Sequence, residues 1–212
     1  MAIGDLDQSG FGRKNSPVKP QADPFGNLKV TEVLPRRAIL SAAGKLYGIE
    51  TGAGTAQAPK TAPVTTTAEW LLYNASPTDT MFLMAVGLFL KSGTLGLGMS
   101  LQVAAAIGTQ TAVTSDYSGT IKTSLSGGTQ TPPVYLGNNI TVVGGTPAWI
   151  PVDATKHNSV ATDSVGDGLM NWDLEGIFSA APYGGIMCDT IGEVGTSALF
   201  SVFFVVAMLN VS

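Results

Sequence analysis

The chain has 212 residues, of which 26 are Gly, and only 12% are charged. Its single cysteine, Cys188, excludes a disulfide within the chain, and one cysteine with one histidine, His157, cannot form a Cys/His zinc site. A hydrophobic content of 44% argues against disorder, which requires low hydrophobicity and high net charge. Abundant Gly, Thr, Ser and Val favour an all-β fold with many turns.

The charges are divided unevenly along the chain. Residues 1–45 carry seven Lys and Arg against four Asp and Glu, a net charge of +3, and residues 46–212 carry four against eleven, a net charge of −7. The second segment is poor in charge, since about a quarter of the residues of an ordinary soluble domain are charged. We expect much of its surface to be buried against copies of itself or a partner. Its negative sign argues against nucleic acid as the body's main partner.

Residues 1–35 predict an extended, basic arm rich in Pro and Gly, because these residues interrupt any helix and apolar residues are sparse. Phe11 and Phe25 each stand beside a Gly and are candidates to anchor the arm in a neighbour's groove. A disordered tail is the alternative. The predicted contact residues are the aromatic and basic side chains of this region: Phe11, Arg13, Lys14, Phe25, Arg36 and Arg37.

The body is expected to span residues 36–212. Ala38–Glu50 predicts a strand pair or one bent strand, and a short helix interrupted at Gly44 is the alternative. Residues 51–67 form a Gly/Ala/Thr/Pro-rich loop, whose length makes it a candidate functional or interface loop.

Three strands are predicted next. Trp70–Asn74 is a short strand, and Thr80–Lys91 and Thr94–Ile107 are expected to form a hairpin that turns at Ser92-Gly93. The residues of Leu95–Val103 alternate between apolar and small or polar side chains, which predicts a strand with one buried face.

The middle of the chain is rich in Thr, Ser and Gly, and residues 108–148 favour an outward-facing meander. Ala148–Val152 predicts an edge strand, because Pro151 cannot donate to a strand ladder. An acidic polar loop follows at residues 153–168, so polar loops are expected over much of 108–168. The strands predicted within the meander are Thr120–Leu125, Val134–Leu136 and Asn139–Val143.

The chain ends in strands predicted at Trp172–Ser179, Gly185–Ile191 and Ser197–Val211. The last of these is apolar on both faces, which is typical of a strand in the middle of a sandwich or between subunits. The whole pattern predicts an antiparallel β-sandwich or jelly-roll-like domain preceded by an extended N-terminal arm.

The long apolar runs at Met81–Leu90 and Ala198–Leu209 are shorter than the roughly 20 residues of a membrane-spanning helix, so we expect buried strands and no membrane span. We expect no secretion signal, because the first residues lack an apolar segment.

The sequence holds no G-x-S-x-G motif and no Walker A motif, and His157 lies in a hydrophilic loop. We therefore expect neither an enzyme nor a cofactor. The acids around Trp172 favour a solvated loop, with a hard cation such as Ca²⁺ and a glycosidase carboxylate pair as alternatives. The weak candidates for a metal ligand are Asp163, Asp167 and Asp173.

The three tryptophans, Trp70, Trp149 and Trp172, are predicted to pack in the core. For all three an interface or a sugar-binding face remains the alternative, and Trp149 and Trp172 are the candidates for recognition. Cys188 is predicted to be a buried, inert residue of a strand.

The basic arm, the Gly- and Thr-rich β body with few charges, the long polar loops and the lack of catalytic motifs together resemble bacteriophage virion proteins of the head decoration, minor capsid or jelly-roll capsid type. The resemblance rests on this overall pattern and transfers no residue's role. It implies a homo-oligomer, often a trimer, located in the virion and made in the host cytoplasm, whose arms reach neighbouring subunits or other virion proteins. The expected function is therefore structural. A receptor- or carbohydrate-binding virion module that uses the 108–168 loops is the alternative.

Overall fold

The computed structural model describes residues 36–51, 56–62, 66–93, 98–156, 169–192 and 198–211. The chain divides into two units, Met1–Ile39 and Leu40–Ser212. Of the first unit only residues 36–39 are described, at the start of helix α1 (Arg36–Ala42). The predicted arm, residues 1–35, lies outside the described residues. Within the described ranges, no helix is long and apolar enough to cross a membrane.

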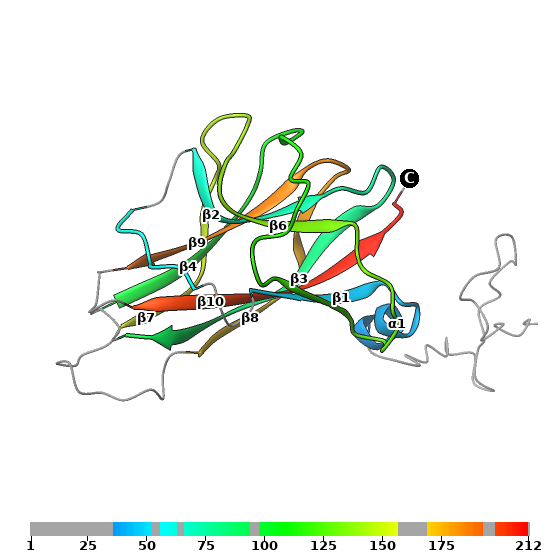
Figure 1. Ribbon diagram of the computed structural model, residues 1–212, viewed down its shortest axis with the longest axis horizontal. Coiled ribbons are helices and arrows are strands. Elements are labelled where there is room, and N and C mark those ends of the chain that lie inside the picture. Colours follow the sequence, from blue (N-terminus) through cyan, green and yellow to red (C-terminus); the bar gives the residue numbers. More distant parts are fainter. Residues whose placement is uncertain are drawn as a thin grey trace, which may run out of the picture. The chain divides into compact units, whose positions relative to one another are not determined.

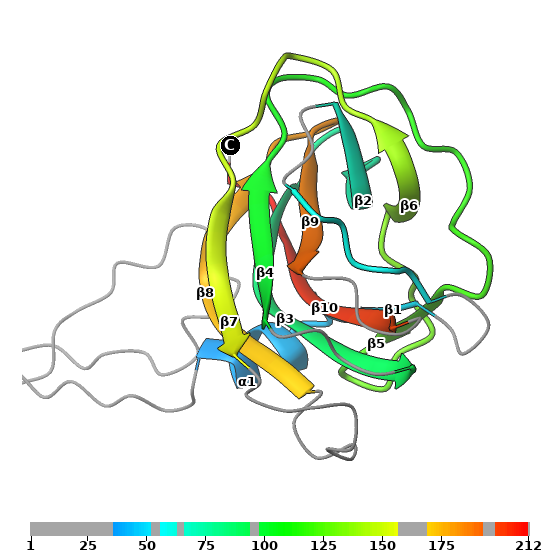
Figure 2. The same ribbon diagram turned by 90° about the vertical axis from the view of Figure 1, so that its left-hand side faces the viewer.

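The second unit contains two antiparallel five-stranded sheets that pack against each other (Figures 1 and 2). The β10 sheet has the strand order β5-β1-β10-β3-β8, and the β2 sheet has the order β6-β2-β9-β4-β7. The predicted all-β, antiparallel sandwich is confirmed. The strands are β1 (Leu46–Glu50), β2 (Thr67–Asn74), β3 (Thr80–Ser92), β4 (Gly98–Ala105), β5 (Ile121–Ser124), β6 (Val134–Thr141), β7 (Ile150–Lys156), β8 (Leu169–Ala180), β9 (Gly185–Gly192) and β10 (Leu199–Leu209).

The main core lies between the sheets and follows from the alternation of side chains along each strand. In β10 the alternate residues from Phe200 to Met208 are buried, and Trp70 of β2 and Leu101 of β4 join them. Burying one such large apolar side chain stabilises the fold by about 1.5–3 kcal/mol. The strand β10 lies between β1 and β3, as its two apolar faces predict. Cys188 is buried in β9, which confirms its expected place.

The predicted hairpin over Thr80–Lys91 and Thr94–Ile107 is wrong. Strand β3 pairs with β10 and β8, whereas β4 pairs with β9 and β7 in the other sheet. Gly93 has φ +83°, as a turn requires, but a turn serves a crossing between sheets as well as a hairpin. The long apolar partner β10 takes the place beside β3 that the hairpin would have given to β4.

The beginning of the body also differs from the strand pair predicted over Ala38–Glu50. The structure has the alternative, a short helix, followed by the single strand β1. The helix ends where Gly44 adopts φ +66°, a left-handed conformation that Gly adopts without steric cost, and Lys45 N–H donates to Leu40 C=O at 2.9 Å.

The predicted meander over residues 108–148 is divided between the sheets. Strand β5 joins β1, while β6 joins β2 and is continuous through Asn139, where two strands were expected. Asn139 achieves this with φ +49°, a conformation in which Asn is enriched. The predicted edge strand is confirmed in β7, which extends beyond Val152 to Lys156.

Candidate functional site

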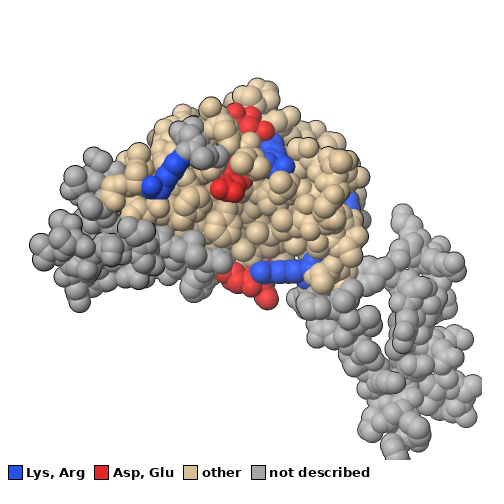
Figure 3. Space-filling model, turned by 60° about the horizontal axis from the view of Figure 1, so that its bottom comes forward, with Lys and Arg blue, Asp and Glu red and all other residues tan. Residues whose placement is uncertain are grey.

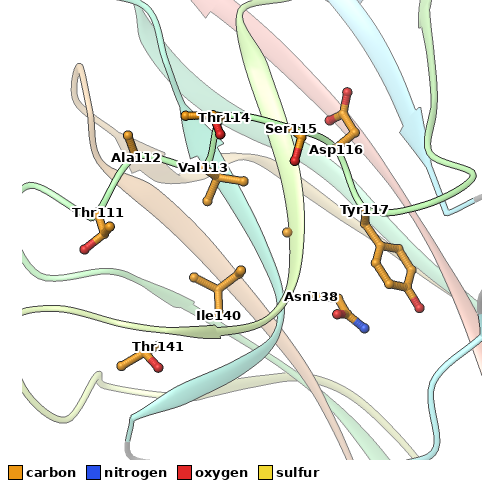
Figure 4. A pocket seen from close by; sticks show the side chains of 11 residues that line it. Thr111, Ala112, Val113, Thr114, Ser115, Asp116, Tyr117, Asn138, Ile140 and Thr141 are labelled. Atoms are coloured by element: carbon orange, nitrogen blue, oxygen red, sulfur yellow. The ribbon is translucent and has the colours of Figure 1, made fainter.

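A groove of about 480 Å³ lies between residues 111–117 and the edge strand β6 (Figure 4). Its residues come from the Thr/Ser/Gly-rich middle of the chain, where polar side chains alternate with single apolar ones. The side chains that line it are those of Thr111, Ala112, Val113, Thr114, Ser115, Asp116, Tyr117, Asn138, Ile140 and Thr141.

The segment that forms one wall is fixed at one end to β6 and at the other end to Val143, two residues beyond β6. At one end, Leu136 N–H donates to an Asp116 carboxylate oxygen at 3.0 Å, and Tyr117 N–H donates to Leu136 C=O at 2.6 Å. At the other end, the Gln110 side chain accepts from Val143 N–H at 2.9 Å and donates to Val143 C=O at 3.0 Å. The sequence between these two fixed points is held as a bridge over the edge of β6.

Between the fixed points the edge of β6 is open. The backbone groups of Leu136 face the bridge, and those of Asn138 face the same way, because every second residue of an antiparallel strand points to the same side. Within the described part of the chain, no hydrogen bond joins residues 111–115 to β6. Asn138 N–H and C=O therefore face the groove.

The charged groups at the end of the groove satisfy one another. The Asp116 carboxylate lies 2.8 Å from Lys122 Nζ and also accepts from Leu136, so both of its oxygens are engaged. Lys122 Nζ also donates to Val134 C=O and lies 4.5 Å from the centroid of the Tyr135 ring. The Lys122 side chain is 8% exposed and that of Asp116 is 31% exposed, so the carboxylate is the charge that solvent meets. These groups fix the loop and leave no free base.

The walls combine an apolar pair with a polar rim. Val113 and Ile140 point toward one another across the groove, and the Asn138 amide lies beside them (Figure 4). The hydroxyl-bearing residues lining it are Thr111, Thr114, Ser115 and Thr141. Gly137 is required beneath them, because a Cβ there would meet the Ile140 side chain at 2.5 Å. This lining offers hydrogen-bonding groups around a small apolar surface, with the Asp116 carboxylate at one end.

A second surface, the outer face of the β10 sheet, carries apolar side chains that are only partly buried, although Phe82 and Val205 pack against a small cluster of Leu46, Met84 and Ala207. Phe82, Phe203 and Val205 are half-buried, and Ile121 and Leu125 of the β5 region are 52% and 46% exposed. The side of the molecule seen in Figure 3 is largely free of Lys, Arg, Asp and Glu, which appear there as isolated groups. Exposed Glu50 is opposite both Ile121 and Phe203, so a carboxylate interrupts the apolar side chains there. Apolar side chains gathered on an outer sheet face mark a candidate interaction site.

Strand β8 forms an irregular edge of the same sheet. Ala85 is opposite Asp173 and Leu83 is opposite Phe178, so residues 174–177 bulge out opposite the single residue Met84. Glu175 and Gly176 have positive φ angles, and Ile177 is 76% exposed. Bulges of this kind bend an edge strand and re-aim its side chains.

A buried acid pair lies on the other sheet. Glu69 N–H donates to an Asp189 carboxylate oxygen at 2.6 Å, and Glu69 accepts from Thr190 N–H at 2.9 Å. Burial raises the pKa of Glu69 to about 8, and the nearby Asp189 adds to this shift. Lys60 Nζ lies 3.5 Å from Asp189. The sequence signal for this pair is a single acid in each of two otherwise apolar or neutral strands.

The strap that carries Lys60, residues 56–62, connects the two sheets. Gln57 exchanges backbone hydrogen bonds with Phe200 of β10, and Lys60 N–H donates to Thr190 of β9 at 2.8 Å. The predicted loop at 51–67 therefore runs, in its described part, as a tether between β10 and β9.

Other predicted site residues are not gathered into one place. Trp149 is half-buried against the cluster of Ala68, Leu71 and Met187. In β8 the backbone of Trp172 is opposite Val86 of β3. The side chain of Trp172 lies outside what the structure describes. Trp70 is fully buried, as predicted.

The basic and acidic candidates are also separate. Arg36 and Arg37 begin α1, and Arg37 is half-buried. Asp173 is exposed and accepts from Glu175 N–H at 3.2 Å. No group of three or more His, Cys, Asp and Glu gathers among the residues the structure describes. Candidates outside the described residues are Phe11, Arg13, Lys14, Phe25, His157, Asp163 and Asp167.

A scan against models of known protein families gave no match, and a search among curated proteins gave none either. Fold, charge and surface are therefore the basis on which a function is inferred.

Proposed function

We propose that this chain is a structural protein of a virus particle, which self-associates and docks onto or into the capsid through its N-terminal arm. A decoration protein and a capsid subunit are both consistent with this role. A homotrimer is the oligomer we favour, since it is common among the virion proteins that the sequence resembles. Other virion proteins would be its further partners.

The observation that carries the proposal is the outer face of the β10 sheet. Half-buried Phe203 and Val205 and exposed Ile121 lie on strands of one sheet, and exposed Leu125 directly follows β5. The charged residue among them is Glu50, which is opposite both Phe203 and Ile121. Covering this face with a second copy would stabilise the assembly by about 25 cal/mol for each Å² of apolar surface removed from water. In an assembling protein such a surface stabilises the contact between subunits, whereas on a lone monomer it promotes aggregation.

The charges support the same role. Ion pairs in the described body hold its own loops, Asp116 with Lys122 and Asp189 with Lys60. Residues 1–45, with a net charge of +3, and residues 46–212, with a net charge of −7, attract each other between neighbouring copies. An arm docked on a partner would add contact area without a larger core.

The proposal is tested by the mass in solution, measured by light scattering, of the full chain and of a chain that starts at Leu34. We expect the full chain to form a discrete oligomer or larger assemblies, and the shortened chain to stay folded, by circular dichroism, but to lose the higher-order species. A full chain that is monomeric at all concentrations would contradict the proposal.

A receptor- or carbohydrate-binding virion module is the second candidate, favoured by the groove of Figure 4, which lies within residues 108–168 and has a hydroxyl rim. Binding of oligosaccharides on a glycan array, lost in Asn138→Ala, would support it. A blank array with a well-folded chain would contradict it.

A further inference from the structure

We propose that the groove between residues 111–115 and β6 receives a short extended stretch of polypeptide, and that its occupant is the N-terminal arm, residues 1–35, of a second copy of this chain. The inference rests on the proposed function, because it names the surface onto which the arm docks.

The open edge of β6 supplies the main-chain contacts. Asn138 N–H and C=O face the groove, and residues 111–115 of the bridge leave them unmatched within the described part of the chain. A strand edge with one open donor and acceptor binds an extended peptide by β-addition. The other edge of β6 is already paired with β2, and Asn138 is opposite Trp70 in that ladder.

The fixed ends of the bridge limit what can enter. Leu136 and Val143 already use their outward backbone groups, and Val142 N–H donates to Thr66 C=O at 2.8 Å, so the open stretch of β6 is residues 137–141. At about 3.3 Å per residue this is roughly 17 Å of strand. The edge of another folded sheet would collide with the bridge, whereas a few residues of an irregular chain fit.

The arm has the sequence that such a groove needs. Phe11 lies between Gly10 and Gly12, and Phe25 precedes Gly26. Glycine neighbours let a backbone approach closely, while the aromatic ring covers the apolar pair in the groove.

Charge and reach agree with this occupant. Arg13 and Lys14 follow Phe11 closely, and Asp116 presents the more exposed charge at the end of the groove. The 35 residues that precede α1 span at most about 120 Å when extended, at 3.3–3.6 Å per residue, which is ample to reach a neighbour.

The site favours polypeptide over sugar because its one aromatic ring is committed. The Tyr117 hydroxyl accepts from the Gln57 side chain at 2.5 Å, and the ring packs against the core cluster. It is therefore poorly placed as a stacking platform for a sugar ring.

The experiment is disulfide cross-linking between two full-length chains with different tags. One chain carries Phe11→Cys or Phe25→Cys, and the other carries Thr114→Cys or Thr141→Cys in the groove. Cys188 stays silent, because it is fully buried and burial raises the pKa of its thiol well above the usual value. The matched control is Thr131→Cys, an exposed threonine that does not line the groove.

We expect a mixed disulfide from at least one arm position with each groove position, roughly tenfold or more over the Thr131→Cys control, because docking raises the local thiol concentration. Adding Asn138→Pro to the groove chain removes the outward N–H while leaving the ladder with β2, and we expect it to lower the yield to the control level. Circular dichroism checks that this variant is folded.

Equal yields at the groove and at Thr131→Cys, or none from either arm position, would overturn the inference. If assembly still depends on the arm in that case, the proposed function survives and the arm docks elsewhere. A monomeric full chain would remove both. Oligosaccharide-dependent shifts of the Asn138 resonance without any cross-link would assign the groove to a sugar and also overturn the inference.

Discussion

The two sheets differ in what lies on their outer faces, although both contain strands that are apolar on both sides. The outer side of the β2 sheet is covered by the chain itself: Leu71 and Met187 are buried there against Val142 and half-buried Trp149. On the outer side of the β10 sheet, Phe203 is only half-buried and Leu125 is 46% exposed. Among the described residues, loops cover the outer face of the β2 sheet, whereas apolar side chains stay partly exposed on the outer face of the β10 sheet.

The difference shows that a doubly apolar strand does not by itself tell a core from an interface. What decides is whether connecting segments return over the face. The polar connections that flank β5 and β6 in the sequence cover the outer face of the β2 sheet. They supply Val113, Val142 and Trp149 to its cluster. In the part of the chain that the structure describes, the β10 sheet receives a small cluster in which Leu40 packs against Leu46, Met84 and Ala207.

The covered face should behave as a core. Leu71→Ala is expected to lower the free energy of unfolding by about 2–5 kcal/mol, because it leaves a cavity under the loops. Leu125→Ala on the uncovered face should change the free energy of unfolding by less than about 0.5 kcal/mol at concentrations where the chain is monomeric. Urea unfolding of both variants measures this, and similar losses would mean that the two faces are equally buried.

The buried acid of the covered sheet should give the stability a pH dependence. The pKa of Glu69 is about 8 in the fold and 4.5 as the ordinary value, so the folded chain retains a proton that the unfolded chain releases. The contribution is therefore fully present below pH 4.5 and is lost as the pH rises to about 8, with a slope of up to roughly 1.4 kcal/mol per pH unit. Glu69→Gln should flatten the slope in urea unfolding, and an unchanged slope would place the titrating group elsewhere.

On the outer face of the β10 sheet, adding one methyl group at Gly87 should lower the free energy of unfolding. A Cβ at Gly87 would overlap the Phe203 ring, so Gly87→Ala is expected to cost about 1–3 kcal/mol. Phe203→Leu in the same chain should recover part of this loss, since the two residues are opposite each other in the ladder. Double-mutant unfolding measurements test this, and strictly additive losses would contradict the contact.

A modest loss of stability is expected where a covering loop is fixed. Asp116→Ala removes the acceptor of Leu136 N–H and the partner of Lys122, which should cost about 1 kcal/mol. Hydrogen exchange at Leu136 N–H should accelerate, while exchange at Val143 N–H, which Gln110 holds, should not. Unchanged protection at Leu136 would show that the loop is held by other contacts.

Local patterns predicted much of the fold. Burial determines the place of two strands: β4, through the alternation around Leu101, and β10, through its two apolar faces. In β7 the missing N–H donor of Pro151 places the strand at an edge. These signals act within a few residues, so a sequence carries them directly.

Pairing over long distances could not be predicted in this way. The Ser92-Gly93 turn permits a hairpin, and only the competition with β10, more than a hundred residues later, sends β4 to the other sheet. The Glu69–Asp189 pair and the groove depend in the same way on segments that meet only in the fold. Neither the acids nor the bridge carries a local motif.

The most direct test of the account is the solution mass of the full chain and of Leu125→Glu, with Val143→Glu as the control. The two side chains are 46% and 45% exposed, but only Leu125 lies on the outer face of the β10 sheet. We predict that Leu125→Glu lowers the mass toward that of a monomer, because a buried charge at the interface is costly, while Val143→Glu keeps the mass of the unmodified chain. An oligomer that survives Leu125→Glu unchanged, or a full chain that is monomeric throughout, would contradict the claim that this face is covered by a second copy.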